Sequence, residues 1–236
     1  MSRHTVVITG ATKGLGRAAT LAFARAGHRV LGLYATDEAA AETLRTELQS
    51  LGSDSCILKH DVSRENADLW NRPEIQQAES LALINNACAP FTPQPFHLLR
   101  WKDFESGLNV GLKGSWLCSR ALLRSMARAR RGTIVNVLST AAHGLPPRGF
   151  AAYATAKHAL RGLTLALAAE YAAKGIRVFS VSPGFMPTAL TAGWDARLVE
   201  AIRTSAPMSD PDGAARRILQ LVEDLATPGQ GEDYPV

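Results

Sequence analysis

Short apolar runs alternate along the chain with longer stretches in which apolar residues recur at helical spacing. The runs show no polar alternation, which is typical of strands in a parallel sheet covered on both faces. They predict strands at Val6–Thr9, Arg29–Tyr34, Ser55–His60, Leu81–Asn85, Thr133–Leu138 and Ile176–Val181. The longer stretches predict helices at Arg17–Ala26, Glu38–Ser50, Asp103–Arg130, Tyr153–Lys174 and Pro211–Glu223.

The repeated strand–helix order predicts an α/β fold of the Rossmann type. Such an order with short loops gives a doubly wound parallel sheet, built from right-handed crossovers, with helices on both faces. No linker, low-complexity segment or internal repeat interrupts the 236 residues. We therefore expect a single dinucleotide-binding domain over residues 1–236, with a substrate lid at about 185–208.

The composition is that of a globular protein, with 46% hydrophobic and 20% charged residues. No stretch reaches the roughly 20 apolar residues that a membrane helix needs. The first residues, Met1–His4, run directly into the apolar run Thr5–Thr9, which leaves no room for a signal peptide. These features predict a cytoplasmic protein without a membrane partner.

The cysteines and histidines show no metal-binding spacing. Cys56, Cys88 and Cys118 are scattered, and none of the six histidines forms an HExxH pattern. We expect reduced thiols and no metal site. The net charge of +5 suits phosphate-bearing ligands, or is simply that of a soluble surface, and it is too diffuse to predict nucleic-acid binding.

A glycine-rich segment, Thr9–Gly16, follows the first strand and opens a helix. Gly10 permits a tight turn, while Gly14 and Gly16 allow the backbone to approach a pyrophosphate closely. The helix N-terminus offers N–H groups and a partial positive charge to that anion. The alternative is a plain glycine-rich turn, but its position between strand and helix favours a dinucleotide site.

Two further strands end in polar residues. Asp61 and Val62 close the third strand, where the carboxylate could accept a hydrogen bond from an adenine amino group, or simply cap a helix. Asn85, Asn86 and Ala87 close the next strand at the carboxyl edge of the sheet. Open α/β sheets bind their ligands at this edge.

Tyr153 and Lys157 lie four residues apart at the start of a helix and therefore share one face. Ser139 ends the preceding strand. A lysine cation and a positive nicotinamide ring would lower the pKa of a tyrosine toward the working range of a general acid or base. The serine hydroxyl could hold a carbonyl oxygen while tyrosine protonates it. A YxxxK pattern is common by chance, but its order behind the other motifs favours catalysis.

With these motifs the chain resembles the short-chain dehydrogenase/reductase family over about residues 5–225, and within it the 3-oxoacyl-carrier-protein reductase branch. The resemblance implies Ser139 and Tyr153 as catalytic, with Lys157 binding the nicotinamide ribose and lowering the pKa of Tyr153. It implies cofactor contacts from the glycine-rich turn, the strand ends and the segment beside the nicotinamide: Gly10, Thr12, Lys13, Gly14, Leu15, Gly16, Thr36, Asp61, Val62, Asn86, Ala87, Tyr153, Lys157, Pro183, Gly184, Met186 and Thr188.

Four departures from the family pattern stand out. Cys88 replaces a glycine next to the cofactor, and Phe179 replaces a common asparagine. Gly229–Val236 lacks the pattern of the usual long final strand, which puts the usual tetramer in doubt. Gly111 stands where the catalytic tetrad has asparagine, and Asn109 lies about 200° away around the helix. The family asparagine positions a water that links the lysine to solvent.

The nicotinamide preference depends on the end of the second strand. NAD-preferring relatives have an acidic residue there, where this chain has Tyr34, with Asp37 three residues later. Lys13 could pair with a 2′-phosphate. The sequence therefore favours NADP(H) over NAD(H), although Asp37 leaves NAD(H) open.

The predicted substrate pocket is apolar. It is formed by Ala89–Phe96, Ala141–Phe150 and Phe185–Trp194, which are rich in Pro, Phe, Leu and Trp. An apolar or extended ketone, either free or linked to a carrier protein or CoA, fits it better than a sugar phosphate.

An arginine stripe offers two interpretations, a solvated helix face or a dock for an acidic acyl carrier protein or a CoA phosphate. The stripe comprises Arg120, Arg124 and Arg128, followed by Arg130 and Arg131. The sequence thus predicts an NADP(H)-dependent ketoreductase that assembles as a homo-oligomer, a dimer or a tetramer. The rival is a cofactor-binding sensor or scaffold with weak or lost turnover, which Gly111 mildly favours.

Overall fold

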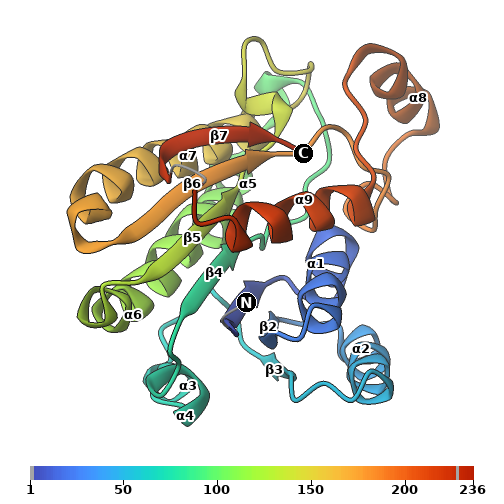
Figure 1. Ribbon diagram of the computed structural model, residues 1–236. Coiled ribbons are helices and arrows are strands. Elements are labelled where there is room, and N and C mark those ends of the chain that lie inside the picture. The colour runs from blue at the N-terminus through green and yellow to red at the C-terminus, as the bar shows by residue number, and fades with distance from the viewer. Residues whose placement is uncertain (1–2, 227–228) are drawn as a thin grey trace.

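A parallel sheet organises the chain. The computed structural model describes residues 3–226 and 229–236, and over these it forms a seven-stranded sheet in the order β3-β2-β1-β4-β5-β6-β7 (Figure 1). Every strand pair is parallel. The strands are β1 Thr5–Thr9, β2 Arg29–Tyr34, β3 Cys56–Lys59, β4 Leu81–Asn85, β5 Gly132–Val137, β6 Ile176–Ser182 and β7 Gln230–Pro235.

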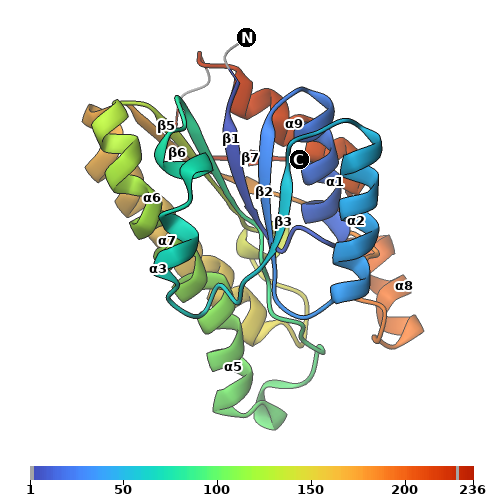
Figure 2. The same ribbon diagram turned by 90° about the horizontal axis from the view of Figure 1, so that it is seen from below.

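Helices cover both faces of this sheet (Figure 2). One face carries α1 Gly14–Arg25, α2 Glu38–Ser50 and α9 Pro211–Glu223. The other carries α5 Trp101–Gly107, α6 Gly114–Ala129 and α7 Ala151–Tyr171, together with the short α3 Ala67–Trp70 and α4 Pro73–Gln76. A further helix, α8 Ala196–Ser205, stands outside these layers (Figure 1). The Rossmann-type doubly wound architecture predicted from the sequence is confirmed.

The core consists of two apolar layers, one on each face. Val6 and Ile8 of β1 pack under α1 and α9, whereas Val7 of the same strand faces α6 and α7. All three side chains are fully buried. Successive residues of a strand point to opposite faces of the sheet, and both faces are buried. The strands therefore appear in the sequence as continuous apolar runs.

The long helix predicted over Asp103–Arg130 is interrupted. A π-helical turn, Leu108–Lys113, separates α5 from α6. Gly107, Gly111 and Gly114 fall in or next to this turn, and glycine weakens an α-helix. A side chain at Gly114 would also collide with Val62, 2.7 Å from its Cβ. The sequence analysis did not predict this interruption.

The prediction that the C-terminus lacks the final strand is wrong. β7 pairs with β6, with a register irregularity between Val178 and Ser180. The sequence pattern hid it because its residues are polar, as befits an edge strand. Phe179, one of the departures from the family pattern, is fully buried, and its ring contacts Tyr234 of β7 at 5.6 Å between centroids.

The order of the strands positions the site. β1 lies between β2 and β4, so the chain winds in opposite directions on its two sides. Open α/β sheets bind ligands outside the carboxyl ends of the strands at such a switch point. The segments that follow β1, β4, β5 and β6 meet there.

Candidate functional site

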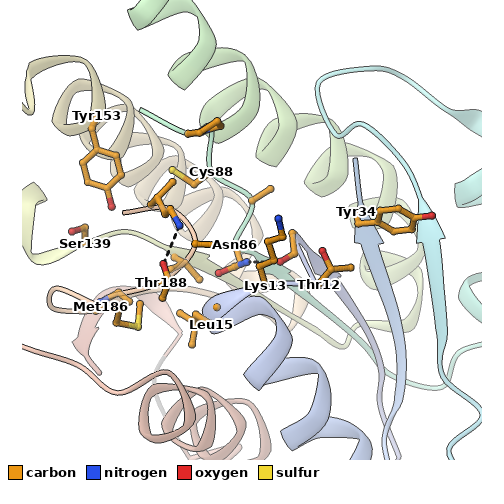
Figure 3. A pocket seen from close by; sticks show the side chains of 18 of the residues that line it. Thr12, Lys13, Leu15, Tyr34, Asn86, Cys88, Ser139, Tyr153, Met186 and Thr188 are labelled. Atoms are coloured by element: carbon orange, nitrogen blue, oxygen red, sulfur yellow. Dashed lines mark hydrogen bonds between the residues drawn. The ribbon is translucent and has the colours of Figure 1, made fainter. Parts of the chain in front are cut away.

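An elongated cleft of about 380 Å³ lies at this switch point. Tyr153 and Ser139 stand at one end, Lys13, Thr12 and Tyr34 at the other (Figure 3). The predicted site residues that line it are Gly10, Thr12, Lys13, Gly14, Leu15, Thr36, Asn86, Ala87, Ser139, Tyr153, Lys157, Pro183, Gly184, Met186 and Thr188. Pro90 and Leu190, which belong to the predicted pocket segments, line the cleft as well. The sequence reasoning did not single out other lining residues, among them Val137 and Leu138. They are apolar, and nothing in their local sequence distinguishes them from core residues.

Three predicted cofactor contacts do not line this cleft. Gly16 is buried beneath the turn, where a Cβ would lie 2.1 Å from the Gly10 carbonyl oxygen. Val62 packs against Gly114 instead. Asp61 accepts hydrogen bonds from the backbone and the hydroxyl of Ser63, at 3.0 and 2.7 Å, and the Ser63 hydroxyl lowers the pKa of this carboxyl.

The glycine-rich turn is held by contacts that leave no room for larger residues. Gly10 has a φ of +65°, and a Cβ there would lie 3.1 Å from both the Ala87 backbone and the Asn86 amide. The Asn86 side chain donates to the carbonyls of Thr9 and Gly10, at 2.9 and 3.2 Å. The Thr9 hydroxyl in turn accepts from the backbone N–H groups of Asn86 and Ala87, both at 2.9 Å. Asn86 therefore positions the turn by tying β1 to β4.

The helix N-terminus behind this turn is available to an anion. Lys13 is the N-cap residue of α1, and no side chain caps the helix there. The first turn of α1 contains no acidic residue. A helix start with uncapped N–H groups and its dipole favours negative charge, so Gly14 and Leu15 could bind a pyrophosphate through their backbone.

Lys13 and Asp37 form an ion pair at the far end of the cleft. Asp37 also caps α2 by accepting a hydrogen bond from the backbone of Ala40 at 2.9 Å. The hydrogen bond from Lys13 is the main cause that lowers the pKa of Asp37. Beside them the hydroxyl of Tyr34 donates to Glu38 at 2.6 Å and accepts from Arg45 at 3.1 Å. Both the cation that could bind a 2′-phosphate and the carboxylate that could bind ribose hydroxyls therefore line one pocket.

The three catalytic candidates meet at the other end. Ser139 follows β5, and its hydroxyl accepts a hydrogen bond from the backbone of Ala141 at 3.2 Å. The hydroxyl of Tyr153 points toward Ser139 (Figure 3). Lys157 is buried, donates to the carbonyl of Val137 at 2.7 Å, and has its Nζ 5.6 Å from the centre of the Tyr153 ring.

Burial dominates the electrostatics of this group. It raises the pKa of Tyr153; the nearby Cys88 thiol acts in the same direction, and a hydrogen bond with Ser139 acts against both. Burial lowers the pKa of Lys157. Without a cofactor the pKa of Tyr153 therefore stands above its usual range. The lowering predicted from the sequence depends on the positive nicotinamide ring in addition to Lys157.

Cys88, one of the predicted departures from the family pattern, lies between the catalytic candidates and the cofactor turn (Figure 3). Its Sγ donates to the carbonyl of Ala89 at 3.4 Å. Burial raises the pKa of this thiol, so it stays protonated at neutral pH. The cysteine therefore adds volume rather than charge to the site.

Gly111 borders a second, much smaller cavity of about 20 Å³ behind Tyr153 and Lys157. A Cβ on Gly111 would meet no heavy atom within 4 Å outside its own helix turn. Its carbonyl accepts a hydrogen bond from the hydroxyl of Ser115 at 2.6 Å. Asn109 is exposed and does not line this cavity. The cavity beside Gly111 and the buried Lys157 is large enough for one water molecule.

Two classes of feature are absent from the residues that the structure describes. No group of three or more His, Cys, Asp or Glu side chains gathers there as a metal site would require. Over residues 3–226 and 229–236, no helix combines the length and the apolar character needed to cross a bilayer.

Comparison with known proteins agrees with this geometry. The chain is 34% identical to the 3-oxoacyl-[acyl-carrier-protein] reductase FabG of Pseudomonas aeruginosa, over 94% of this chain and 90% of that protein. It is 32% identical to the uncharacterized oxidoreductase YgfF of Escherichia coli, over 94% and 93% of the two chains.

Solved structures share the whole fold. A 3-ketoacyl-(acyl-carrier-protein) reductase from Brucella melitensis, complexed with NADH, superposes with a TM-score of 0.87 at 26% identity, covering 100% of this chain and 96% of that one. A candidate NAD(P)-dependent gluconate 5-dehydrogenase from Beutenbergia cavernae, with NADP bound at low occupancy, gives 0.87 at 28% identity, covering 100% and 95%. The family described as short chain dehydrogenase matches residues 4–198. The chain belongs to the short-chain dehydrogenase family and is an NAD(P)-dependent oxidoreductase.

Proposed function

We propose that this enzyme is an NADP(H)-dependent ketoreductase that interconverts an apolar ketone and its secondary alcohol. The observation that carries the proposal is the convergence of Ser139, Tyr153 and Lys157 at one end of a cleft whose other end is the glycine-rich turn. A pure binding protein has no need for an acid, a hydrogen-bond donor and a buried cation at one point.

Each of these side chains has a separate task in the proposed reaction. The Ser139 hydroxyl donates a hydrogen bond to the carbonyl oxygen and fixes its direction. The Tyr153 hydroxyl transfers its proton to that oxygen as the alcohol forms. A bound dihydronicotinamide supplies the hydride that the carbonyl carbon receives.

Lys157 has two tasks in this proposal. Its ammonium is fixed by the Val137 carbonyl on one side and faces the cleft on the other, so it can hold the ribose of the cofactor. Its charge stabilises the tyrosinate left after proton transfer. The small cavity beside Gly111 gives room for a water through which Tyr153 and Lys157 regain protons from solvent.

Binding of the dinucleotide is proposed to begin at the turn. The backbone of Gly10, Gly14 and Leu15 would bind the pyrophosphate, and Thr12 and Thr36 would border the adenosine. Met186 and Thr188 would hold the nicotinamide amide, with Pro183 and Gly184 beside the ring. Gly16 and Val62 would act from beneath, by shaping the turn and packing behind it. Both bonds from Ser63 go to Oδ1 of Asp61, so the other oxygen of this carboxylate, Oδ2, would be the one to meet the adenine.

The preference for NADP(H) rests on Lys13, whose ammonium would pair with the 2′-phosphate. That pairing requires Asp37 to leave Lys13, and Asp37 remains bound to the start of α2 through Ala40. Relatives of similar sequence bind either NADP or NADH. Comparing kcat/KM for NADPH and NADH on one ketone tests this step, and a preference for NADH would assign the ribose contact to Asp37 instead.

An acidic carrier protein or a CoA phosphate is the proposed partner of the arginine stripe on α6. Arg120 donates to Glu65 at 2.8 Å and lies 4.6 Å from the Trp116 ring, so it is already engaged by its neighbours. Reversing the charge of Arg128 and Arg130 should then slow a carrier-linked ketone and spare a free one, with a loss that shrinks as salt rises. Equal effects on both substrates would mean that the arginine stripe supports the fold and does not bind a partner.

The direct experiment follows NADPH oxidation by the purified protein with a panel of ketones, alongside NADPH binding by fluorescence. Turnover of an apolar ketone supports the proposal. Binding of NADPH without turnover of any ketone would favour the sensor or scaffold, for which Gly111 and the raised pKa of Tyr153 are the arguments.

A further inference from the structure

Aromatic rings from separate segments enclose the catalytic candidate Tyr153. Phe91, from the loop after β4, stacks on the Tyr153 ring with 4.5 Å between centroids and 14° between planes. Phe150, the N-cap of α7, meets both rings edge-on at 5.2 and 5.9 Å. Trp194 closes the group at 5.0 Å from Phe91 and 5.5 Å from Phe150. We refer to Phe91, Phe150 and Trp194 as the aromatic cap.

A hydrogen bond fastens this cap. The indole N–H of Trp194 donates to the backbone carbonyl of Phe91 at 2.9 Å. A tryptophan that packs among other rings requires a partner for its N–H, so the bond fixes both the indole and the loop that carries Phe91. Two segments about a hundred residues apart are thereby tied together next to the catalytic end.

The segment that carries Trp194 is anchored at its base as well. Phe185 and Met208 form a β-bridge, and the N–H of Phe185 donates to the carbonyl of Pro207 at 2.7 Å. Nearer the tip, the backbone N–H of Trp194 donates to the carbonyl of Thr191 at 3.0 Å. The base of this segment is therefore held by backbone pairing. Its tip contacts the loop after β4 through Trp194.

The cap sits where the cleft ends. Pro90 and Leu190 line the cleft, but their neighbours Phe91 and Trp194 do not, because these rings pack on one another. The hydroxyl of Tyr153 remains directed at Ser139 (Figure 3). A ketone whose oxygen lies between these hydroxyls would have one substituent directed toward the cap.

We propose that Trp194 determines the size of the substrate, so that the closed cap admits ketones with a compact apolar substituent and disfavours long acyl chains. This inference rests on the proposed function and narrows its substrate class. Long chains would have to open the bond between Trp194 and Phe91 and separate the rings, whereas a short substituent would fit beneath them. No charged side chain belongs to the cap, so the preferred substituent is uncharged.

The test compares kcat/KM for short-chain and long-chain methyl ketones in the wild type, Trp194→Ala and Trp194→Phe. Trp194→Ala removes the ring and the bond, and Trp194→Phe keeps a ring and removes only the bond. Trp101→Ala is the control, since Trp101 is 71% exposed and contacts Phe104 rather than the cap. Melting temperature and NADPH affinity show whether each variant remains folded.

We expect Trp194→Ala to raise the long-to-short ratio of kcat/KM by about tenfold or more, the scale on which an apolar pocket discriminates by size. Trp194→Phe should raise it by a smaller factor, and Trp101→Ala should leave it unchanged. An unchanged ratio in Trp194→Ala, or a wild type that prefers long chains, would overturn the proposal.

A second readout does not depend on turnover. Cys88 lines the cleft beside Tyr153, so its alkylation by a bulky maleimide in the NADP-loaded protein reports access from the capped end. Peptide mapping distinguishes it from Cys56 and from the buried Cys118. We expect several-fold faster labelling of Cys88 in Trp194→Ala than in the wild type or Trp101→Ala. Faster labelling without turnover of any ketone would support the cap and reject the ketoreductase; equal labelling rates would reject the cap.

Discussion

The two ends of the cleft are built by different means. At the cofactor end, Gly10 and Gly16 let backbone approach backbone, and Asn86 and Thr9 bond to main-chain groups. At the substrate end, the aromatic cap closes the site with side chains from loops far apart in the sequence. The cofactor end requires residues without a side chain, because a larger residue would collide there. The substrate end depends on which large side chains are present. Substitutions in the glycine-rich turn should therefore weaken folding and dinucleotide binding, whereas substitutions in the aromatic cap should change which substrates the enzyme accepts.

Tyr153, where the two ends meet, should give the largest effect. Tyr153→Phe removes the proton donor and keeps the ring that stacks on Phe91. Turnover should fall by about 10²–10⁴-fold, the usual contribution of a positioned general acid, while NADPH affinity stays nearly constant. Tyr171→Phe, at the far end of the same helix, is the matched control. Retention of half the activity in Tyr153→Phe would refute the proposed proton transfer.

Gly16 tests the cofactor end. The Cβ of Gly16→Ala would lie 2.1 Å from the carbonyl oxygen of Gly10 and 2.6 Å from the Asn86 amide, so the turn must shift. We expect a loss of about 1–3 kcal/mol in the free energy of unfolding and weaker dinucleotide binding. Gly162→Ala in α7, where a Cβ meets nothing within 4 Å, should instead stabilise the protein by about 0.5–1 kcal/mol. Denaturant titration of both variants measures the contrast; similar values would mean that the turn tolerates a side chain.

Lys13 should give a smaller and more selective effect. Lys13→Ala removes the proposed partner of the 2′-phosphate and should weaken NADPH binding by about 1–2 kcal/mol, with little change for NADH. Fluorescence titration with both dinucleotides checks this. Lys102→Ala, which removes the same charge from exposed α5, controls for the overall field. Equal losses for NADPH and NADH would mean that Lys13 does not bind the 2′-phosphate and serves only as the ion-pair partner of Asp37.

The contrast between the two ends also explains what the sequence could predict. The glycine-rich turn, Asn86, Ser139, Tyr153 and Lys157 form local motifs at strand ends, so their meeting follows from the parallel sheet alone. The segments around the aromatic cap were predicted as apolar pocket walls, but the contact between Phe91 and Trp194 depends on the path of two loops. Periodicity says nothing about such a path, and it likewise missed α8 and the polar edge strand β7.

Gly111→Asn should give the smallest effect. This substitution tests whether the catalytic end works without the asparagine of the family pattern. The residue lies in the π-helical turn, and an added Cβ meets no heavy atom within 4 Å outside that turn. Gly111→Asn would therefore place the asparagine expected from the family pattern at a position that accepts a Cβ, beside the one-water cavity behind Lys157. If a water held by the backbone and Lys157 already relays protons, turnover should change by no more than a few-fold, and we expect this result because the buried Lys157 still has donors to offer.

Gly162→Ala, remote from the site, controls for the removal of a helical glycine, and turnover measured across pH is the assay. A rise of an order of magnitude or more, greatest near the apparent pKa of the reaction, would mean that the natural chain is poorly equipped for catalysis. The sensor would then be the better account of its function.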